Sequence, residues 1–338
     1  MTDALPLLIE IGTEELPPTS LTTLERAFGQ LVGEALLIEG FEHDGLQTYA
    51  TPRRLAIVIN SIAITQPDQA IERRGPAVTA AYDQAGQPTK ALAGFARSCG
   101  VSADTPFETI TSDKGAWVVY RATTPGLTLA ERLGPILEDA LKQLPIARRM
   151  RWRDLSAEFV RPVRWLAVMI GAEVVPIELF GCTASNQSQG HRFMGQGAFE
   201  IRSPLEYASQ LAEHFVMANR LDRQKMIWTA LMAKAESLGG VIPENDALLD
   251  EVTALVEWPT VLAGHFDERF LRVPSEVLIS AMREHQRYFH LVDEAGQLLP
   301  VFLTVANVDS PKPEIVIKGN ERVITPRLTD AEFFYDKD

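Results

Sequence analysis

The sequence has few cysteines, no long apolar run and no excess of basic residues. Its 338 residues include only Cys99 and Cys182, which are too far apart to indicate a zinc site or a disulfide framework. No stretch approaches the roughly 18 apolar residues of a membrane span, and no signal peptide opens the chain. We therefore expect a cytoplasmic protein with no membrane partner and no metal site.

The charge balance is acidic, with 32 lysines and arginines against 45 aspartates and glutamates and a formal net charge of -13. This balance argues against a surface that attracts nucleic acid uniformly, and it predicts no DNA partner. Any contact with RNA must use a local basic patch.

The hydrophobic pattern predicts an α+β fold with several domains, in which helices pack on mixed and largely antiparallel sheets. An apolar strand at 7–11 is followed by a helix over 19–39, whose apolar residues recur at spacings of three and four, and then by strands at 45–50 and 55–64. This β-α-β-β order is compatible with a split βαβ, ferredoxin-like sheet.

Changes in composition divide the chain into four parts. Segments 1–65 and 145–200 predict an N-terminal α+β domain, and 66–144 predicts a small α+β module inserted into it. Segment 201–310 predicts a second α+β domain. Segment 311–338 predicts the start of a truncated helical domain, helical on either side of Thr325-Pro326.

The first strand ends in an acidic corner. Gly12 permits a turn and Pro17-Pro18 stop the strand, so Glu14 and Glu15 are held between the strand and the first helix. No base or metal partner for these carboxylates is evident elsewhere in the sequence. We expect a positional role, in which they favour the helix dipole or accept hydrogen bonds from an arginine.

The most basic part of the chain lies between residues 148 and 164, where six arginines stand against two acids and alternate with tryptophan. Arginine presents a planar donor fork to phosphate and an aromatic ring offers a face to a base, so we predict an RNA contact here. The alternative is that these arginines pair with acids of neighbouring elements. The predicted contact residues are Arg148, Arg149, Arg151, Trp152, Arg153, Arg161 and Arg164.

Four further residues are candidates for contact with RNA or with a partner protein. Arg53 and Arg54 lie at a turn between two strands and suit a phosphate or a partner's carboxylate, or else form an exposed charge pair. His191 and Arg192 lie in a glycine-rich loop. No serine, cysteine or carboxylate stands at a spacing that indicates a nucleophile and its base, so we assign no catalytic residue.

Several segments resemble one family in chain order. They are LIEIGTEELPP at 8–18, TPRRLA at 51–56, PTKA at 88–91, RMRW at 149–152, FVRPVRWL at 159–166, GHRF at 190–193, REHQRYF at 283–289, and GNERV at 319–323 followed by PRL at 326–328. On these motifs the chain resembles the N-terminal half of the β subunit of bacterial heterotetrameric glycyl-tRNA synthetase, a family about twice as long.

The resemblance implies a role in protein synthesis as part of an aminoacyl-tRNA synthetase. In that family ATP, with Mg²⁺, and glycine are bound by a separate α subunit of class II type. The β subunit holds tRNA(Gly) and completes an α2β2 assembly. The resemblance thus implies that this half binds no cofactor and is inactive alone, and that 201–310 resembles a β-subunit domain used for editing in the phenylalanine enzyme.

Three functions follow from the residues and the resemblance. The first is an RNA-binding and assembly subunit of a glycine-tRNA ligase, in which the arginine cluster contacts tRNA phosphates. The second is a purely structural assembly module that never touches RNA. The third is a deacylase-like hydrolase that uses His191.

Overall fold

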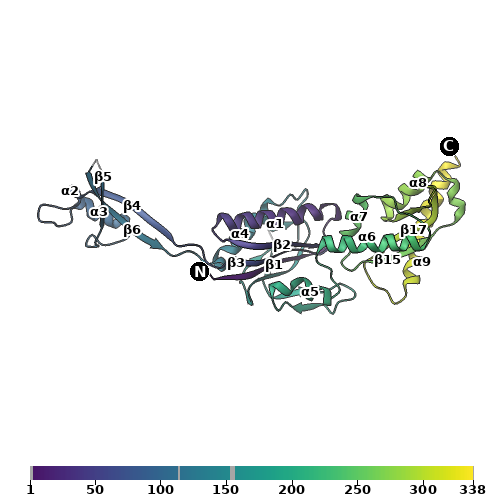
Figure 1. Ribbon diagram of the computed structural model, residues 1–338, viewed down its shortest axis with the longest axis horizontal. Helices are drawn as coiled ribbons and strands as arrows, with labels where there is room; N and C mark the ends of the chain where they lie inside the picture. Colours follow the sequence, from purple (N-terminus) through teal and green to yellow (C-terminus); the bar gives the residue numbers. More distant parts are fainter. Residues whose placement is uncertain (1–2, 113–114, 153–156, 338) are drawn as a thin grey trace.

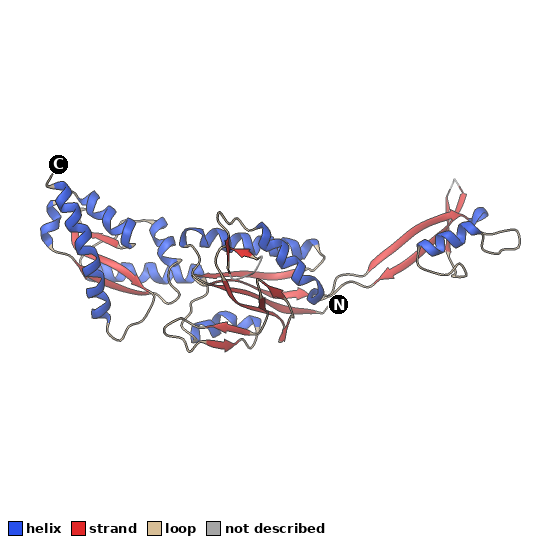
Figure 2. Ribbon diagram, turned by 180° about the vertical axis from the view of Figure 1, so that it is seen from behind, coloured by secondary structure: helices blue, strands red, loops and turns tan. Residues whose placement is uncertain are grey.

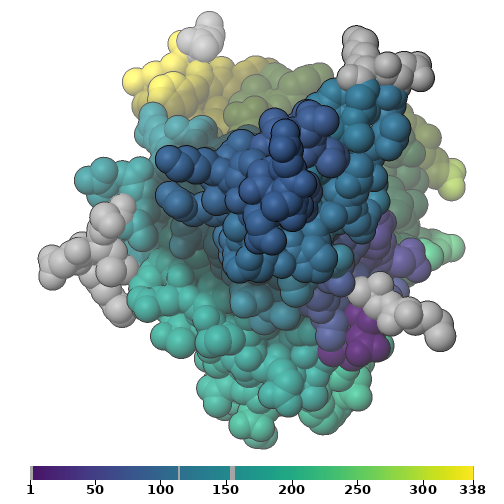
Figure 3. All heavy atoms as spheres, turned by 90° about the vertical axis from the view of Figure 1, so that its left-hand side faces the viewer, coloured from purple at the N-terminus to yellow at the C-terminus, as the bar shows by residue number. Residues whose placement is uncertain are grey.

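The computed structural model describes residues 3–112, 115–152 and 157–337. Three parts follow one another along an elongated molecule: an arm (66–127), a central lobe (3–65 and 128–219) and a C-terminal lobe (220–337) (Figure 1). The view from behind shows the two long strands of the arm running towards the central lobe, to which two loops connect them (Figure 2). Viewed from the arm end, the blue arm stands in front of the two lobes (Figure 3).

The sheet of the central lobe is organised around its first strand. β1 (Ala4–Thr13) pairs with β3 (Arg54–Ala63) on one side and with β9 (Val163–Ile170) on the other. β2 (His43–Thr51) and β10 (Glu173–Val174) form the edges, giving the order β10-β9-β1-β3-β2. All of these pairings are antiparallel, and the predicted β-α-β-β order at the start of the chain is confirmed.

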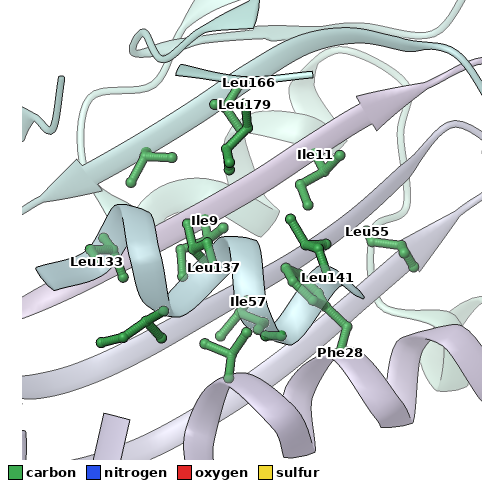
Figure 4. Close-up of a cluster of buried hydrophobic side chains, with 14 of the residues drawn as sticks. Ile9, Ile11, Phe28, Leu55, Ile57, Leu133, Leu137, Leu141, Leu166 and Leu179 are labelled. Carbon is green, nitrogen blue, oxygen red and sulfur yellow. The ribbon is translucent and has the colours of Figure 1, made fainter. Parts of the chain in front are cut away.

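Two helices cover one face of this sheet. Side chains alternate along β1, and Leu7, Ile9 and Ile11 are fully buried on the face covered by α1 (Leu21–Ile38) and α4 (Leu129–Gln143). Figure 4 shows the helices closing over the strands. The helices contribute Phe28, Leu133, Leu137 and Leu141 to the same cluster.

The opposite face of the sheet is covered by α5 (Tyr207–Glu213). Tyr207 and Leu211 of this helix pack with Leu8 of β1 and Met169 of β9. Because both faces are covered, β1 has apolar residues at consecutive positions rather than a simple alternation with polar ones.

The structure places α4 in the central lobe, whereas the sequence assigned residues up to 144 to the inserted module. Leu133 and Leu137 are fully buried in the central cluster. The helix has one apolar face, which needs a sheet to cover it, and the central sheet provides that cover. With α4 and β9 the lobe has the order β-α-β-β-α-β, and the arm is inserted between β3 and α4.

The arm has a three-stranded antiparallel sheet of its own, in the order β4-β6-β5. Leu92 of α3 packs against Val118 of β6 in a small core. The arm contains β4 (Gln69–Ala77), α2 (Val78–Ala81), α3 (Lys90–Ser98), β5 (Glu108–Ser112) and β6 (Gly115–Thr124).

The C-terminal lobe contains a second antiparallel sheet in the order β15-β17-β16, with helices packed around it. Ile227 and Leu231 of α6 pack with Leu303 of β17 in its core. The lobe contains α6 (Arg220–Ser237), α7 (Asp246–Thr253), β15 (Thr260–His265), α8 (Ser275–Ser280), β16 (Phe289–Val292), β17 (Leu298–Ala306) and α9 (Pro313–Tyr335).

The last helix, α9, runs through Pro326 without interruption, whereas the sequence predicted a break there and the start of a separate domain. Pro326 lies on the exposed side of the helix, so the carbonyl of Arg322 that lacks a donor can bind water. On the other side, Ile324 and Leu328 are fully buried in a cluster of the C-terminal lobe.

Short elements complete the fold: β7 (Met150–Arg151), β8 (Glu158–Phe159), β11 (Glu178–Leu179), β12 (Cys182–Thr183), β13 (Gln187–Gln189), β14 (Ala198–Glu200), η1 (Pro18–Ser20), η2 (Pro204–Glu206), η3 (Glu268–Arg272) and η4 (Ala281–His285). The mixture of helices and antiparallel sheets confirms the predicted α+β class. In the described part of the chain, no helix is both long and apolar enough to cross a membrane.

Candidate nucleic-acid interface

Two arginines hold the acidic corner at the end of β1. Glu14 accepts hydrogen bonds from Arg164 Nε at 2.6 Å and from Arg192 Nη2 at 3.1 Å. Arg192 Nη1 also lies 2.9 Å from a carboxylate oxygen of Glu15. The hydrogen bond from Arg164 is the main reason why the pKa of Glu14 is lowered. The corner therefore accepts hydrogen bonds from arginines, as the sequence predicted.

Further contacts extend this corner along the surface. Arg161 Nε donates to the backbone carbonyl of Glu15 at 3.0 Å, and its Nη1 lies 3.5 Å from Met150 Sδ. Met150 precedes Arg151, which pairs with Glu158 across the β7–β8 ribbon. The contacts thus form one continuous surface. We call Arg151, Arg161, Arg164 and Arg192 the arginine strip.

Three of these guanidinium groups face solvent. The exposed fraction of the side chain is 72% for Arg151, 50% for Arg164 and 43% for Arg192. Exposed ion pairs contribute about 0–1 kcal/mol to stability. An incoming phosphate can therefore replace a carboxylate as the partner of these arginines at little cost.

Two more of the predicted contact residues flank the arginine strip. Arg148 is exposed and has no ion-pair or hydrogen-bond partner within the described ranges. Arg149 Nη2 donates to the carbonyl of Lys142 at 2.9 Å, at the end of α4. With them the surface carries six arginines on a chain whose net charge is -13. Glu14, Glu15 and Glu158 pair with members of the strip, and Glu138 and Glu178 line the cleft beside Arg149 and Arg151. Arg153, the remaining predicted arginine, lies outside the described residues.

Trp152 is partly buried beside this surface. Its ring packs against Phe180, with 6.1 Å between the ring centroids, at the edge of the central hydrophobic cluster. Arg149, Arg151 and Phe180 line a neighbouring cleft of about 670 Å³. Trp152 therefore packs beside the strip as part of the hydrophobic cluster, and its ring is not fully available to stack on a base.

Arg53 and Arg54 are buried, so they are not an exposed hairpin charge pair. Arg54 has no exposed surface, and its Nη2 and Nη1 lie 3.2 Å from Glu257 Oε1 and 3.5 Å from Glu10 Oε1. Arg53 Nη2 lies 3.1 Å from the other oxygen of Glu257. We call Arg53, Arg54, Glu10 and Glu257 the buried arginine network. It leaves no face of Arg54 open to an RNA phosphate.

Trp165 closes this network on the sheet. Its Nε1 donates to Glu10 Oε1 at 3.0 Å, and its ring centroid lies 5.6 Å from the guanidinium carbon of Arg54. The ring lies directly on Gly12, where a Cβ would approach ring atoms to 1.9 Å. Gly12 is therefore required for this close packing.

The two carboxylates of the network have pKa shifts of opposite sign. Burial raises the pKa of Glu10 more than Arg54 lowers it. Burial also acts to raise the pKa of Glu257, but Arg54 and Arg53 more than offset it, so that pKa is lowered. Glu257 is therefore the principal counter-charge of both arginines.

The network also joins the two lobes, because Glu257 lies just before β15. Nearby, Arg220 Nε donates to Glu25 at 2.7 Å, and Arg223 Nη2 donates to the carbonyl of Ala50 at 2.8 Å. Burial lowers the pKa of Arg223 to about 10. These contacts between the lobes consist of buried, hydrogen-bonded charges.

His191 is buried and has a structural hydrogen-bond pattern. Its Nδ1 accepts from the backbone N–H groups of Phe193 and Met194, each at 3.2 Å. Its Nε2 is buried without a hydrogen-bond partner among the described residues. Neither ring nitrogen contacts a nucleophile or reaches solvent, so this geometry does not favour the deacylase hypothesis. Nor does any group of three or more His, Cys, Asp or Glu side chains able to hold a metal occur in the described ranges.

The sequence did not predict the roles of two residues, Glu257 in the buried arginine network and Phe193 beside the arginine strip. Glu257 stands 203 positions from its partner Arg54, so no local spacing connects them. Phe193 is 77% exposed, although large apolar residues are usually covered. The signal for Phe193 was present, since it follows His191 and Arg192 in a loop rich in glycine.

The fold and the surface describe a multidomain α+β protein with a ferredoxin-like central sheet and a local arginine surface on an acidic chain. Residues 7–338 match the family described as "Glycyl-tRNA synthetase beta subunit". The glycine-tRNA ligase beta subunits of Marinobacter nauticus and Hahella chejuensis are each 46% identical to this chain, over 333 and 332 residues. That of Haemophilus influenzae is 44% identical over 332 residues.

The chain therefore belongs to the glycyl-tRNA synthetase β-subunit family, which confirms the resemblance predicted from its motifs. Each of these alignments covers 98% of this chain and 48% of the relative. The chain thus spans about half the length of the curated relatives it matches.

Proposed function

We propose that this chain is the part of a cytoplasmic glycine-tRNA ligase that helps to bind tRNA(Gly) and to assemble the enzyme with its α subunit. In this proposal ATP, Mg²⁺ and glycine are bound by the α subunit, and the present chain supplies no catalytic residue. The observation that carries the proposal is the arginine strip, an exposed cationic surface on an acidic member of this family.

The proposed mechanism of binding is electrostatic. Each arginine that contacts a phosphate releases condensed counterions, which makes affinity depend steeply on salt. Glu14 and Glu15 pair with Arg164 and Arg192 until RNA arrives, and the phosphates then replace these exposed carboxylates as partners. Contacts of this type position an RNA but do not read its sequence.

A charge-removal experiment with a matched control tests the proposal. Arg151→Ala and Arg164→Ala, in the enzyme assembled with its α subunit, are expected to weaken binding of a tRNA(Gly) transcript by about three- to ten-fold each. Each variant should also reduce the slope of affinity against salt by about one. The control is Arg202→Ala, because Arg202 is also exposed and paired with glutamates but lies outside the strip.

The outcome separates RNA binding from assembly alone. Loss of affinity in the strip variants, with Arg202→Ala unchanged, supports RNA binding. Unchanged RNA affinity together with a loss of the assembled enzyme would instead support the purely structural module. Unchanged affinity and unchanged assembly would remove the arginine strip from the proposal altogether.

A further inference from the structure

Phe193 is an exposed aromatic residue at the end of the arginine strip. The residue is 77% exposed, and it directly follows Arg192, which binds both Glu14 and Glu15. A single exposed apolar residue is common on protein surfaces and says little alone. What distinguishes Phe193 is how firmly its backbone is held.

The turn over residues 190–197 is held by hydrogen bonds within itself. His191 Nδ1 accepts from the backbone N–H of Phe193, and Gly195 N–H donates to the carbonyl of His191 at 2.9 Å. Gly190 N–H donates to the carbonyl of Gly197 at 2.9 Å. A Cβ at Gly195 would lie 2.7 Å from His191 N, so the turn closes too tightly for any other residue there.

The rest of the molecule also anchors this turn. Arg53 Nη2 donates to the carbonyl of Gly190 at 2.6 Å, which connects the turn to the buried arginine network. His191 N–H donates to the carbonyl of His214 at 2.9 Å, and Asp309 N–H lies 3.3 Å from Met194 Sδ. The backbone of Phe193 is thus fixed from both sides. Its ring lies beside the ring of His191, with 6.1 Å between centroids, and stays largely exposed.

We propose that Phe193 is a stacking platform for an unpaired nucleobase of the RNA that the arginine strip binds; this proposal rests on the proposed function. An RNA duplex hides its base faces except at its ends and in single strands, where aromatic side chains stack on them. Arginines beside Phe193 hold the phosphates next to such a base. Because the turn is already rigid, little entropy is lost when the base stacks.

The chemistry of the site favours a nucleobase over an apolar protein segment. The surface around Phe193 is built from paired arginines and glutamates, which a protein partner would have to desolvate. A base needs only one ring face, and its own phosphates supply counter-charges to Arg164 and Arg192. Binding by an apolar protein segment is therefore an outcome that the test must distinguish.

The test replaces Phe193 in the assembled enzyme and measures binding of two RNA duplexes, one with a short single-stranded 3′ tail and one without it. Phe193→Ala should weaken binding of the tailed duplex by about 5- to 100-fold and leave the blunt duplex unchanged. Phe193→Trp should restore binding to within about three-fold, since it keeps a flat aromatic face. Phe193→Leu should not restore it, because leucine is apolar without such a face.

A control and the salt dependence separate this proposal from the proposed function. Phe334→Ala removes another exposed aromatic residue, 66% exposed in α9, and should have no effect. Phe193→Ala should keep the wild-type salt slope, since no phosphate contact is lost. If Arg164→Ala weakens binding but Phe193→Ala does not, the stacking proposal fails and the proposed function stands. If neither variant weakens binding, both fail.

Two further outcomes would overturn stacking. Equal binding by the leucine and tryptophan variants would show that apolar packing is sufficient. Loss of enzyme assembly in Phe193→Ala, with RNA binding intact, would identify a protein partner as the occupant.

His191 is the positioning residue of this platform, and a double-mutant cycle tests that role. His191→Ala should weaken binding of the tailed duplex when Phe193 is present and add nothing in a Phe193→Ala background. His191→Asn should retain affinity, because the asparagine Oδ1 replaces Nδ1 as the acceptor. The role would be contradicted if the affinity losses of His191→Ala and Phe193→Ala added fully in the double variant. It would also be contradicted if His191→Asn folded normally and bound the tailed duplex as poorly as His191→Ala.

Discussion

The buried arginine network and the arginine strip are both built from arginines paired with glutamates, but the first is buried and the second is exposed. In the network, Arg54 and Glu10 have no exposed surface and join secondary elements of two lobes through Glu257. In the strip, Arg151 and Arg164 are at least half exposed while paired with glutamate. A buried ion pair cannot lose a partner without leaving an unpaired charge, whereas an exposed pair exchanges partners with water or phosphate at little cost.

Arginines in the motifs of this family divide by burial into two kinds. Those of TPRRLA hold the lobes together, whereas Arg149 and Arg151 of RMRW, Arg164 of FVRPVRWL and Arg192 of GHRF face solvent. Removing a buried one should reduce stability, while removing an exposed one should change only binding.

The largest effect is expected from Arg54→Met. This change leaves Glu10 and Glu257 buried with fewer counter-charges, and breaking a buried pair costs about 3–5 kcal/mol. Urea unfolding measures the loss. Arg121→Met is the control, because Arg121 also pairs with two glutamates but is exposed, and its unfolding midpoint should hardly move. Equal losses in the two variants would contradict the division by burial.

Glu257→Gln should also destabilise the protein, by about 3 kcal/mol at neutral pH. The pKa of Glu257 is lowered in the folded state, so its contribution is present above the unfolded-state pKa and is lost as pH falls through the folded-state value. The difference in unfolding free energy between wild type and variant should therefore shrink below about pH 4.5, the ordinary value for this carboxyl. A difference that is constant with pH would show that charge is not the cause.

Glu10→Gln should cost less, about 1 kcal/mol or below. Arg54 keeps Glu257 as its counter-charge, and the amide oxygen can accept the hydrogen bonds from Ser188 and Trp165. The pKa of Glu10 is raised, so the folded state binds its proton at a higher pH than the unfolded state does. Wild type should therefore gain stability over the variant as pH falls through the raised pKa towards the ordinary value. This trend is opposite in sign to that of Glu257, and the same unfolding titration measures both.

The smallest effect concerns the acidic corner. Glu14→Gln removes a negative charge between Arg164 and Arg192, so RNA affinity should rise by about two- to five-fold with stability nearly unchanged. Glu206→Gln, which removes the exposed partner of Arg202 away from the strip, should leave RNA affinity as it is. A loss of affinity in Glu14→Gln would mean that the carboxylate's hold on the two arginines matters more than its charge.

Local patterns predicted much of the fold. The apolar spacing placed β1, α1, β2 and β3 in the right order. The same patterns did not show which core covers α4, because its amphipathic face fits any sheet, and the arm separates it from the strands it packs on. The uninterrupted course of α9 through Pro326 likewise depends on Ile324 and Leu328 finding cover in the lobe.

By itself, the sequence determined the family, the α+β class and the arginines that are candidates for binding phosphate, because these follow from motifs and hydrophobic periods. Only the tertiary structure decided which arginines are buried and which face solvent. A guanidinium has the same chemistry in every motif, and its role depends on the carboxylates that fold against it. For Arg54 that carboxylate is Glu257, 203 positions away, while for Arg164 it is Glu14, at a corner that stays open to solvent.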